Sequence, residues 1–222
     1  LLGQWMKLRG NRQEIVVMAK GAHTPFCDPE SLTRQFLETL DRMQTDYVDI
    51  YTMHRDNPEI PAGEFIDVVN EHMRAGRIHV FGVSNWSLDR VDKANAYAKA
   101  HGLRGISGVS NNFSLARMIE APWNGCIAAK DQPSREWFTK TRLPLLAWSS
   151  QAQGFFALGD SPEWPNLWMA RCWSSEDNFQ RLTRAKELAQ KYGVSALNIA
   201  LAYVLNQPFP IFALVGPQTP TE

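Results

Sequence analysis

Segments of strand length alternate with segments of helical periodicity along most of this chain of 222 residues. Runs rich in β-branched and aromatic residues, such as 46–53 and 78–83, are each followed by an amphipathic stretch, such as 62–75 and 88–100. No hairpin turn joins two neighbouring runs. Strands separated by helical crossovers pair in parallel, so the pattern predicts an α/β fold built on a parallel sheet.

The individual elements can be placed from periodicity and from their end residues. The expected strands cover residues 14–20, 46–54, 78–86, 105–112, 143–148 and 211–215. The expected helices cover residues 1–8, 28–43, 62–75, 88–100, 134–140, 177–192 and 196–206, and residues 154–173 are expected to be a loop. The run at 14–20 is continuously apolar up to its lysine, which is typical of a parallel strand buried on both faces.

Polar side chains stand at nearly every expected strand end, namely Lys20, His54, Ser84 with Asn85, Asn112 and Ser149. An α/β barrel places its chemistry at the carboxyl ends of its strands. An open doubly wound sheet is expected to carry a glycine-rich phosphate turn after an early strand, and no G-x-G-x-x-G is present. The chain is therefore predicted to be a barrel.

A single histidine at a strand end is more often structural than catalytic, so His54 alone carries little weight. Together with Asp56 it could form a metal pair. The remaining histidines, His23, His72, His79 and His101, are scattered without ligand spacing, so no metal site is predicted.

Composition excludes several classes of function. Lys plus Arg and Asp plus Glu both number 23, so the chain has no electrostatic footprint for nucleic acid or for an anionic membrane. The 3 cysteines are widely spaced and form neither a disulfide framework nor a zinc ligand set, which predicts a reducing, cytoplasmic setting. No apolar run approaches the length of a membrane span.

Three segments resemble signatures of the aldo-keto reductase family. Residues 46–56 resemble its "DYVDLYxxHxxD", and residues 76–86 resemble its "GKIRxxGVSNW", which is the most specific of the three. Residues 14–20 resemble the strand that ends in the family's active-site lysine. Weaker similarities follow at Asn111-Asn112, Ala147-Trp148-Ser149 and Gly216–Pro220.

The resemblance implies a (β/α)8 TIM-type barrel, with strands three to eight represented in this chain. It also implies reduction of an aldehyde or ketone by hydride transfer from NADPH or NADH, with NADPH favoured, no metal and a small-molecule carbonyl substrate. By resemblance, Lys20 lowers the pKa of a catalytic tyrosine and His54 orients and polarises the carbonyl. The implied cofactor contacts are Ser84, Asn85, Asn112, Trp148, Ser149, Gln151, Gly216, Gln218 and Thr219, and the implied substrate contact is Trp86.

The chain departs from the family pattern in two ways. The catalytic aspartate and tyrosine of the family follow its first two strands, which the segment from Leu1 does not contain, so residues 1–222 are expected to be a single barrel domain incomplete at both ends. Gln218 stands near the place where many NADPH-preferring relatives carry an arginine. A catalytically silent cofactor-binding or regulatory subunit on the same barrel therefore stays an alternative. Trp164, Trp168 and Trp173 either line a substrate pocket or pack the long loop.

Overall fold

A computed structural model describes residues 1–157, 167–217 and 219 of the chain. It contains two compact units, Leu1–Val109 and Ser110–Glu222. Strands and helices alternate in both, and the strand pairs whose register is defined run parallel. The predicted alternation without hairpins is thereby confirmed. The prediction that residues 1–222 form one domain stays a prediction.

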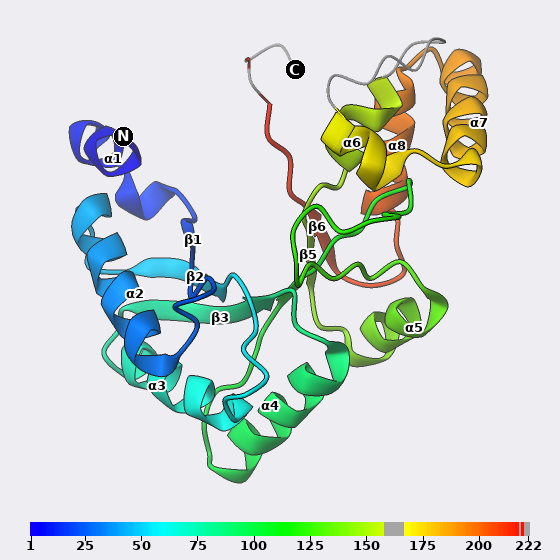
Figure 1. Ribbon diagram of the computed structural model, residues 1–222. Helices are drawn as coiled ribbons and strands as arrows, with labels where there is room; N and C mark the ends of the chain where they lie inside the picture. Colours follow the sequence, from blue (N-terminus) through cyan, green and yellow to red (C-terminus); the bar gives the residue numbers. More distant parts are fainter. Residues whose placement is uncertain (158–166, 218, 220–222) are drawn as a thin grey trace. The chain divides into compact units, whose positions relative to one another are not determined.

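The first unit is built on three parallel strands, β1 (Met18–Gly21), β2 (Val48–Met53) and β3 (Ile78–Ser84), which pair in chain order. Helices α2 (Pro29–Met43), α3 (Ala62–Arg74) and α4 (Leu88–Ala100) connect or follow them (Figure 1). The short helices α1 (Leu2–Arg9) and η1 (Arg12–Glu14) precede β1. In register, Lys20 faces Thr52, and Thr52 faces Gly82.

Helix ends in the first unit follow from local chemistry. The Asp28 carboxylate accepts the Ser31 backbone N–H at 2.8 Å, and Pro29 occupies the first helical position, as predicted for the start of α2. Helix α3 ends at Arg74, and Gly76 beyond it adopts φ of 72°, which glycine accepts without strain. The end of α3 at this glycine sets the position at which β3 begins.

Alternation along β2 separates the two faces of the sheet. Tyr51 packs against Phe36 of α2, with ring centroids 4.9 Å apart, so its side chain points toward the helix layer. Thr52, the next residue, points to the opposite face together with its register partners Lys20 and Gly82. His54 follows Thr52 by two residues and belongs to that same face.

The strand predicted at 14–20 is shorter than expected, because β1 begins at Met18. Val16 is 76% exposed, so the expectation of burial on both faces is wrong at this end. The Asp49 carboxylate takes the N–H of Val17 at 2.8 Å, and a side-chain acceptor thus replaces a ladder partner there. Arg12 anchors the same carboxylate at 2.9 Å.

The second unit contains β5 (Leu145–Ala147) paired in parallel with β6 (Ile211–Ala213), and the two-residue strand β4 (Val109–Ser110) begins where this unit joins the first. Its helices are α5 (Gln132–Thr141), α6 (Leu167–Trp173), α7 (Glu176–Tyr192), α8 (Ala196–Leu205) and the 3-10 segment η2 (Ala152–Ala157). The strand predicted at 105–112 is reduced to β4 and an isolated bridge at Asn112.

Residues 167–173 form a helix, although the sequence predicted a loop there. Trp173 is fully buried in a cluster with Phe155 and Leu182, and its indole N–H donates to Gln153 at 3.1 Å. Trp173 therefore packs the fold. Trp168 contacts the ring of Trp123, with centroids 5.2 Å apart, and Trp164 lies outside the described residues. Glycine and proline nearby masked the helical spacing of Met169, Cys172 and Trp173.

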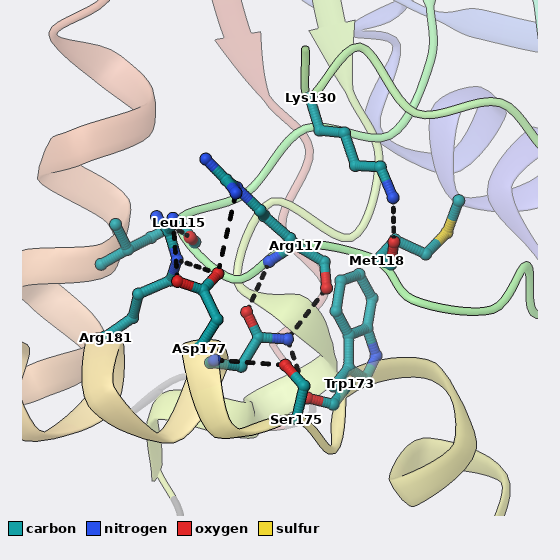
Figure 2. Close-up of polar contacts among 9 residues, drawn as sticks. Leu115, Arg117, Met118, Lys130, Trp173, Ser175, Asp177 and Arg181 are labelled. Atoms are coloured by element: carbon teal, nitrogen blue, oxygen red, sulfur yellow. Dashed lines mark hydrogen bonds and ion pairs between the residues drawn. The ribbon is translucent and has the colours of Figure 1, made fainter.

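Hydrogen bonds tie the start of α7 to Arg117, in the segment that follows β4 (Figure 2). The Asn178 amide oxygen accepts the Arg117 N–H at 2.8 Å, and the Asn178 amide nitrogen donates to the carbonyl oxygens of Arg117 and Trp173 at 2.9 and 2.8 Å. The side chain is completely buried. Because each of these groups would otherwise lack a partner away from water, the segment from Leu115 to Met118 is fixed against the start of α7.

The part of the chain that the structure describes has neither a membrane-crossing helix nor a metal-holding cluster. None of the helices in this part of the chain combines the length and the apolar character needed to cross a membrane. The same residues contain no cluster of three or more His, Cys, Asp or Glu side chains arranged to hold a metal ion.

Candidate active site

Lys20 and His54 lie at the carboxyl ends of two neighbouring parallel strands. Lys20 is the third residue of β1, and His54 directly follows the last residue of β2. The His54 backbone N–H donates to the Gly21 carbonyl oxygen at 2.7 Å, so the ladder continues one residue past the strand. With the alternation above, this register puts both side chains on the face that points away from α2. The structure thus brings together the two residues expected to be catalytic.

The imidazole of His54 is held uncharged. Burial, followed by the nearby positive charges of Arg55, Lys20 and His23, lowers the pKa of His54 from 6.5 to about 4. The His23 ring meets the His54 ring edge-on, with centroids 4.8 Å apart. A neutral imidazole carries no charge and can donate one N–H to a ligand oxygen.

Lys20 has an unusually acidic ammonium group. Burial, reinforced by the charge of Arg55, lowers the pKa of Lys20 from 10.5 to about 8. The amine still carries its proton at neutral pH, but it gives up that proton more readily than a surface lysine does. A group whose pKa lies near the working pH is suited to proton transfer and to stabilising a developing negative charge.

The main chain that carries His54 is fixed by side chains from three segments. The His54 carbonyl oxygen accepts from Arg55 Nη1 at 2.9 Å and from Asn85 Nδ2 at 3.2 Å. The next carbonyl, that of Arg55, accepts from Trp86 Nε1 at 3.1 Å and from Cys27 Sγ at 3.4 Å. Both carbonyl groups therefore have two donors, and the strand end cannot shift without breaking several bonds.

The motif after β3 folds as a tight, buried turn. Asn85 adopts φ of 59°, a left-handed conformation that asparagine tolerates better than most residues, and its amide donates to Ser84 Oγ at 3.1 Å. Trp86 is fully buried, packs against Phe65 and carries the Arg90 guanidinium on its ring. Contact of Trp86 with substrate stays a prediction; the observed role of its N–H is to hold Arg55.

In the second unit, Asn112 and Trp148 are brought together. Asn112 forms parallel bridges to Ala128 and Trp148, and its amide nitrogen donates to the Trp148 carbonyl at 3.0 Å. The Trp148 indole nitrogen is buried and has no hydrogen-bond partner among the described residues. Asn112 itself is 1% exposed, so its amide oxygen and the unpaired indole N–H are the polar groups presented here.

The remaining expected cofactor contacts lie in the loops after β5 and β6. Ser149 adopts φ of 46°, and its carbonyl accepts the Ala152 N–H at 2.8 Å, so the loop turns sharply after Trp148. Gln151 is half-buried, and Gly216 and Thr219 are exposed. Gln218 lies outside the described residues. Ser150, which the sequence did not single out, joins the two loops by donating to the Leu214 carbonyl at 2.8 Å.

Sequence reasoning missed Arg55, Cys27 and His23, which surround His54. Arg55 follows the histidine directly in the motif, yet nothing in the sequence indicates that it is only 6% exposed. Cys27 is 1% exposed and its thiol donates to the Arg55 carbonyl, so burial and the nearby Asp56 raise the pKa of Cys27 to about 11. The position of Cys27 one residue before the cap of α2 gives no indication of this contact.

Comparisons with known proteins show the family of the chain. The profile of the Aldo/keto reductase family matches residues 1–222, and the chain belongs to that family. An uncharacterized oxidoreductase, YrpG of Bacillus subtilis, is 26% identical over 99% of this chain and 68% of its own length. Norsolorinic acid reductase B of Aspergillus parasiticus is 24% identical over 97% of this chain and 58% of its own length.

A solved structure shows the same fold. The thermostable aldo-keto reductase Tm1743, crystallised with the inhibitor epalrestat, superposes with a TM-score of 0.75 over 99% of this chain and 67% of its own chain, at 22% identity. The predicted (β/α)8 barrel class is thereby confirmed. Family membership and the related oxidoreductases identify the protein as an oxidoreductase.

Proposed function

We propose that the protein reduces an aldehyde or ketone to an alcohol with NADPH or NADH as the reductant. The observation that carries this proposal is the pairing of Lys20 and His54 on one face of adjacent strands, with the pKa of each held well below its ordinary value. Lys20 is a cation that gives up its proton readily, and His54 is a neutral N–H donor. A carbonyl oxygen that gains negative charge needs both kinds of group.

The polar residues of the site suit a nicotinamide carboxamide, which has one acceptor and two donor positions. In the first unit, Ser84 and Asn85 supply hydroxyl and amide groups of both kinds. The second unit, taken by itself, offers the Asn112 amide, the flat ring of Trp148 and an indole nitrogen that has no hydrogen-bond partner among the described residues. When bound, a reduced nicotinamide supplies the hydride for the carbonyl carbon.

The contributions of this chain are orientation, polarisation and charge. His54, fixed through its own carbonyl and N–H, donates a hydrogen bond to the carbonyl oxygen and sets its direction. Lys20 stabilises the negative charge that develops on that oxygen and is the group whose proton leaves most readily. Both residues are half-buried, which strengthens these interactions relative to open water.

A nicotinamide-binding subunit without turnover is the second candidate, and the position of Tyr51 favours it. The Tyr51 hydroxyl is buried against Gly21, where a Cβ would lie 2.5 Å from it, and its ring faces α2. Burial raises the pKa of the Tyr51 hydroxyl well above its ordinary value. Tyr51 therefore does not act as the proton donor of the site, and Lys20 is the group described here that can release a proton.

Titration of the full-length protein with NADPH and with NADH, followed by tryptophan fluorescence, tests cofactor binding. Saturable quenching with either cofactor is expected, with a modest preference for NADPH because Gln218 offers no charge for the 2′-phosphate. Saturation without any consumption of cofactor in the presence of aldehydes would favour the silent subunit. No saturable change would contradict both.

We place this activity in the cytoplasm, since Cys27, Cys126 and Cys172 are free thiols.

A further inference from the structure

The side chain of Arg90 reaches from α4 onto the loop that follows His54. Its Nε donates to the Asp56 carboxylate at 2.7 Å, and its Nη2 donates to the carbonyl oxygens of Asn57 and Ile60 at 3.0 and 2.7 Å. The Asp56 and Arg90 side chains are each only 16% exposed. One guanidinium therefore holds three points of the loop between β2 and α3.

The contacts of Arg90 use two different nitrogen atoms, Nε and Nη2. A guanidinium is planar and directs its N–H groups along fixed lines, whereas a lysine carries all its donors on one mobile ammonium. A hydrogen bond with an ionised partner is stronger than a neutral one, and shielding from water strengthens the ion pair with Asp56 further. The loop from Asp56 to Ile60 is therefore held in one arrangement.

Arg90 is also connected to the backbone next to His54. Its guanidinium lies over the Trp86 ring, 4.8 Å from the centroid, and the Trp86 indole N–H donates to the Arg55 carbonyl oxygen at 3.1 Å. Both side chains come from the start of α4 and the turn before it. Together they fix the chain on the C-terminal side of His54, from Arg55 to Ile60.

A second loop is bound to the same segment. The Asn57 amide nitrogen donates to the Cys27 carbonyl oxygen at 3.1 Å, and the Cys27 thiol donates to the Arg55 carbonyl oxygen at 3.4 Å. The loop of Cys27 also carries His23, whose ring meets the His54 ring edge-on. An ordered segment after β2 therefore keeps this neighbouring loop against the imidazole, and the imidazole stays buried.

We propose that Arg90 is a positioning residue: it holds the loop after β2 so that the His54 imidazole keeps one orientation toward the substrate carbonyl. This inference rests on the proposed function. Arg90 acts through the backbone, because its described contacts are with that loop and with the ring of Trp86. The expected effect is large, since displacing a reacting group by about 1 Å can cost on the order of 100-fold in rate.

The ionisation of His54 tests the proposal without turnover. Nitrogen-15 NMR of the full-length protein follows the imidazole, whose signals are assigned by their loss in His54→Ala. The test variant combines Arg90→Met with Asp56→Asn, so that the ion pair is removed without a change of net charge. The other groups whose charge acts on the ring are retained, namely Arg55, Lys20 and His23.

Wild type is expected to titrate near pH 4, because burial lowers the pKa of His54 to about 4. In the test variant the loosened loops admit water to the ring, so the pKa of His54 should rise above about 5. A folded test variant in which His54 titrates as in wild type would overturn the proposal. If the test variant does not fold, Arg90→Lys replaces it, and an unchanged pKa of His54 there would overturn the proposal equally.

Arg181→Met combined with Asp177→Asn is the matched control. Arg181 pairs with Asp177 at 2.9 Å and donates to the Leu115 carbonyl oxygen at 3.4 Å (Figure 2). Its side chain is 18% exposed, close to the value for Arg90. The control removes a similar ion pair from the second unit and is expected to leave the pKa of His54 as in wild type. An equal rise of that pKa in the control would overturn the proposal.

Turnover separates this inference from the proposed function. With NADPH and an aldehyde that wild type reduces, the test variant is expected to lower kcat by about 10- to 100-fold and to change the affinity for NADPH little. Adding His54→Ala to the test variant should cost no more than His54→Ala alone, because Arg90 then has no imidazole to position. Losses that multiply in the combined variant would overturn the proposal. If wild type reduces no aldehyde, the proposed function fails, and the NMR titration alone decides the role of Arg90.

Discussion

The indole N–H of Trp86 and the carbonyl oxygen of Arg55 form a hydrogen bond of 3.1 Å between the loops that follow β3 and β2. Through it, the most specific motif of the sequence supports the histidine at the end of the neighbouring strand. Trp86 is fully buried, and its ring also contacts Phe65 and Arg90. Trp86 therefore stabilises the backbone next to His54 through this hydrogen bond.

Trp86→Phe should lower the free energy of unfolding by about 1–3 kcal/mol, because it removes the hydrogen bond and leaves a partly filled cavity. Urea denaturation of the full-length protein measures this. Trp123→Phe is the control, since Trp123 is 56% exposed and should lose about 0.5 kcal/mol or less. Equal losses in both variants would show that the Trp86 contact carries no special stability.

Asn178→Ala should destabilise the protein by about 2–5 kcal/mol, because three buried hydrogen bonds disappear and their backbone partners lose a neighbour away from water. Asn206→Ala, at the exposed end of α8, removes a single bond to Ala202 and should cost about 1 kcal/mol or less. Thermal unfolding of both variants gives the comparison. A loss below about 1 kcal/mol at Asn178 would refute its role as a connection point.

Activity should fall as pH rises through about 8, where folded Lys20 loses its proton. Lys20→Arg keeps the positive charge and should remove this limb from the profile of kcat/KM, whatever its absolute rate. An alkaline limb near pH 8 that persists in Lys20→Arg would assign it to another group.

The same shift has a consequence for stability. Because the folded pKa of Lys20 lies below its unfolded value of 10.5, the unfolded chain binds more protons between pH 8 and 10.5. The contribution of Lys20 to stability therefore improves as pH rises through that window. Urea midpoints at pH 8 and pH 10 in wild type and Lys20→Met should differ by this contribution, and identical pH dependence in both proteins would contradict it.

His54→Ala should reduce turnover on the order of 100-fold while changing cofactor affinity little, since the imidazole acts on the carbonyl oxygen. With a folded pKa of about 4, His54 stays neutral above that pH, so the acid side of the rate profile should show no step near 6.5. His23→Ala removes the neighbouring ring and serves as control. Parallel losses of turnover and cofactor binding in His54→Ala would indicate a structural histidine.

The sequence predicts much of this fold where period and end residues agree. The run before His54 ends where β2 ends, because a β-rich stretch gives way to an Asn-Pro loop. Asp28 with Pro29 begins α2 as expected, and the helix at 134–140 is found as α5 (Gln132–Thr141). Lys20, His54, Ser84 and Asn85 lie at adjacent strand ends because parallel strands share one carboxyl edge.

What the sequence could not predict depends on side-chain partners distant in the chain. Val16 reads as strand core, but the Asp49 carboxylate ends the ladder beside it. Arg55 reads as an ordinary polar residue, and only the contacts of Trp86, Cys27 and His54 show it to be buried. The helix at Leu167–Trp173 is hidden by the composition of the surrounding loop.

Hydride transfer itself is the most direct test of the central claim. Full-length protein is incubated with an aldehyde and NADPH that carries deuterium at the transferable position of C4, and the alcohol is examined by mass spectrometry. One deuterium on the carbinol carbon is expected in wild type, with the yield reduced on the order of 100-fold in His54→Ala. Alcohol without deuterium, or no alcohol with any of a panel of neutral and carboxylated aldehydes, would contradict the account.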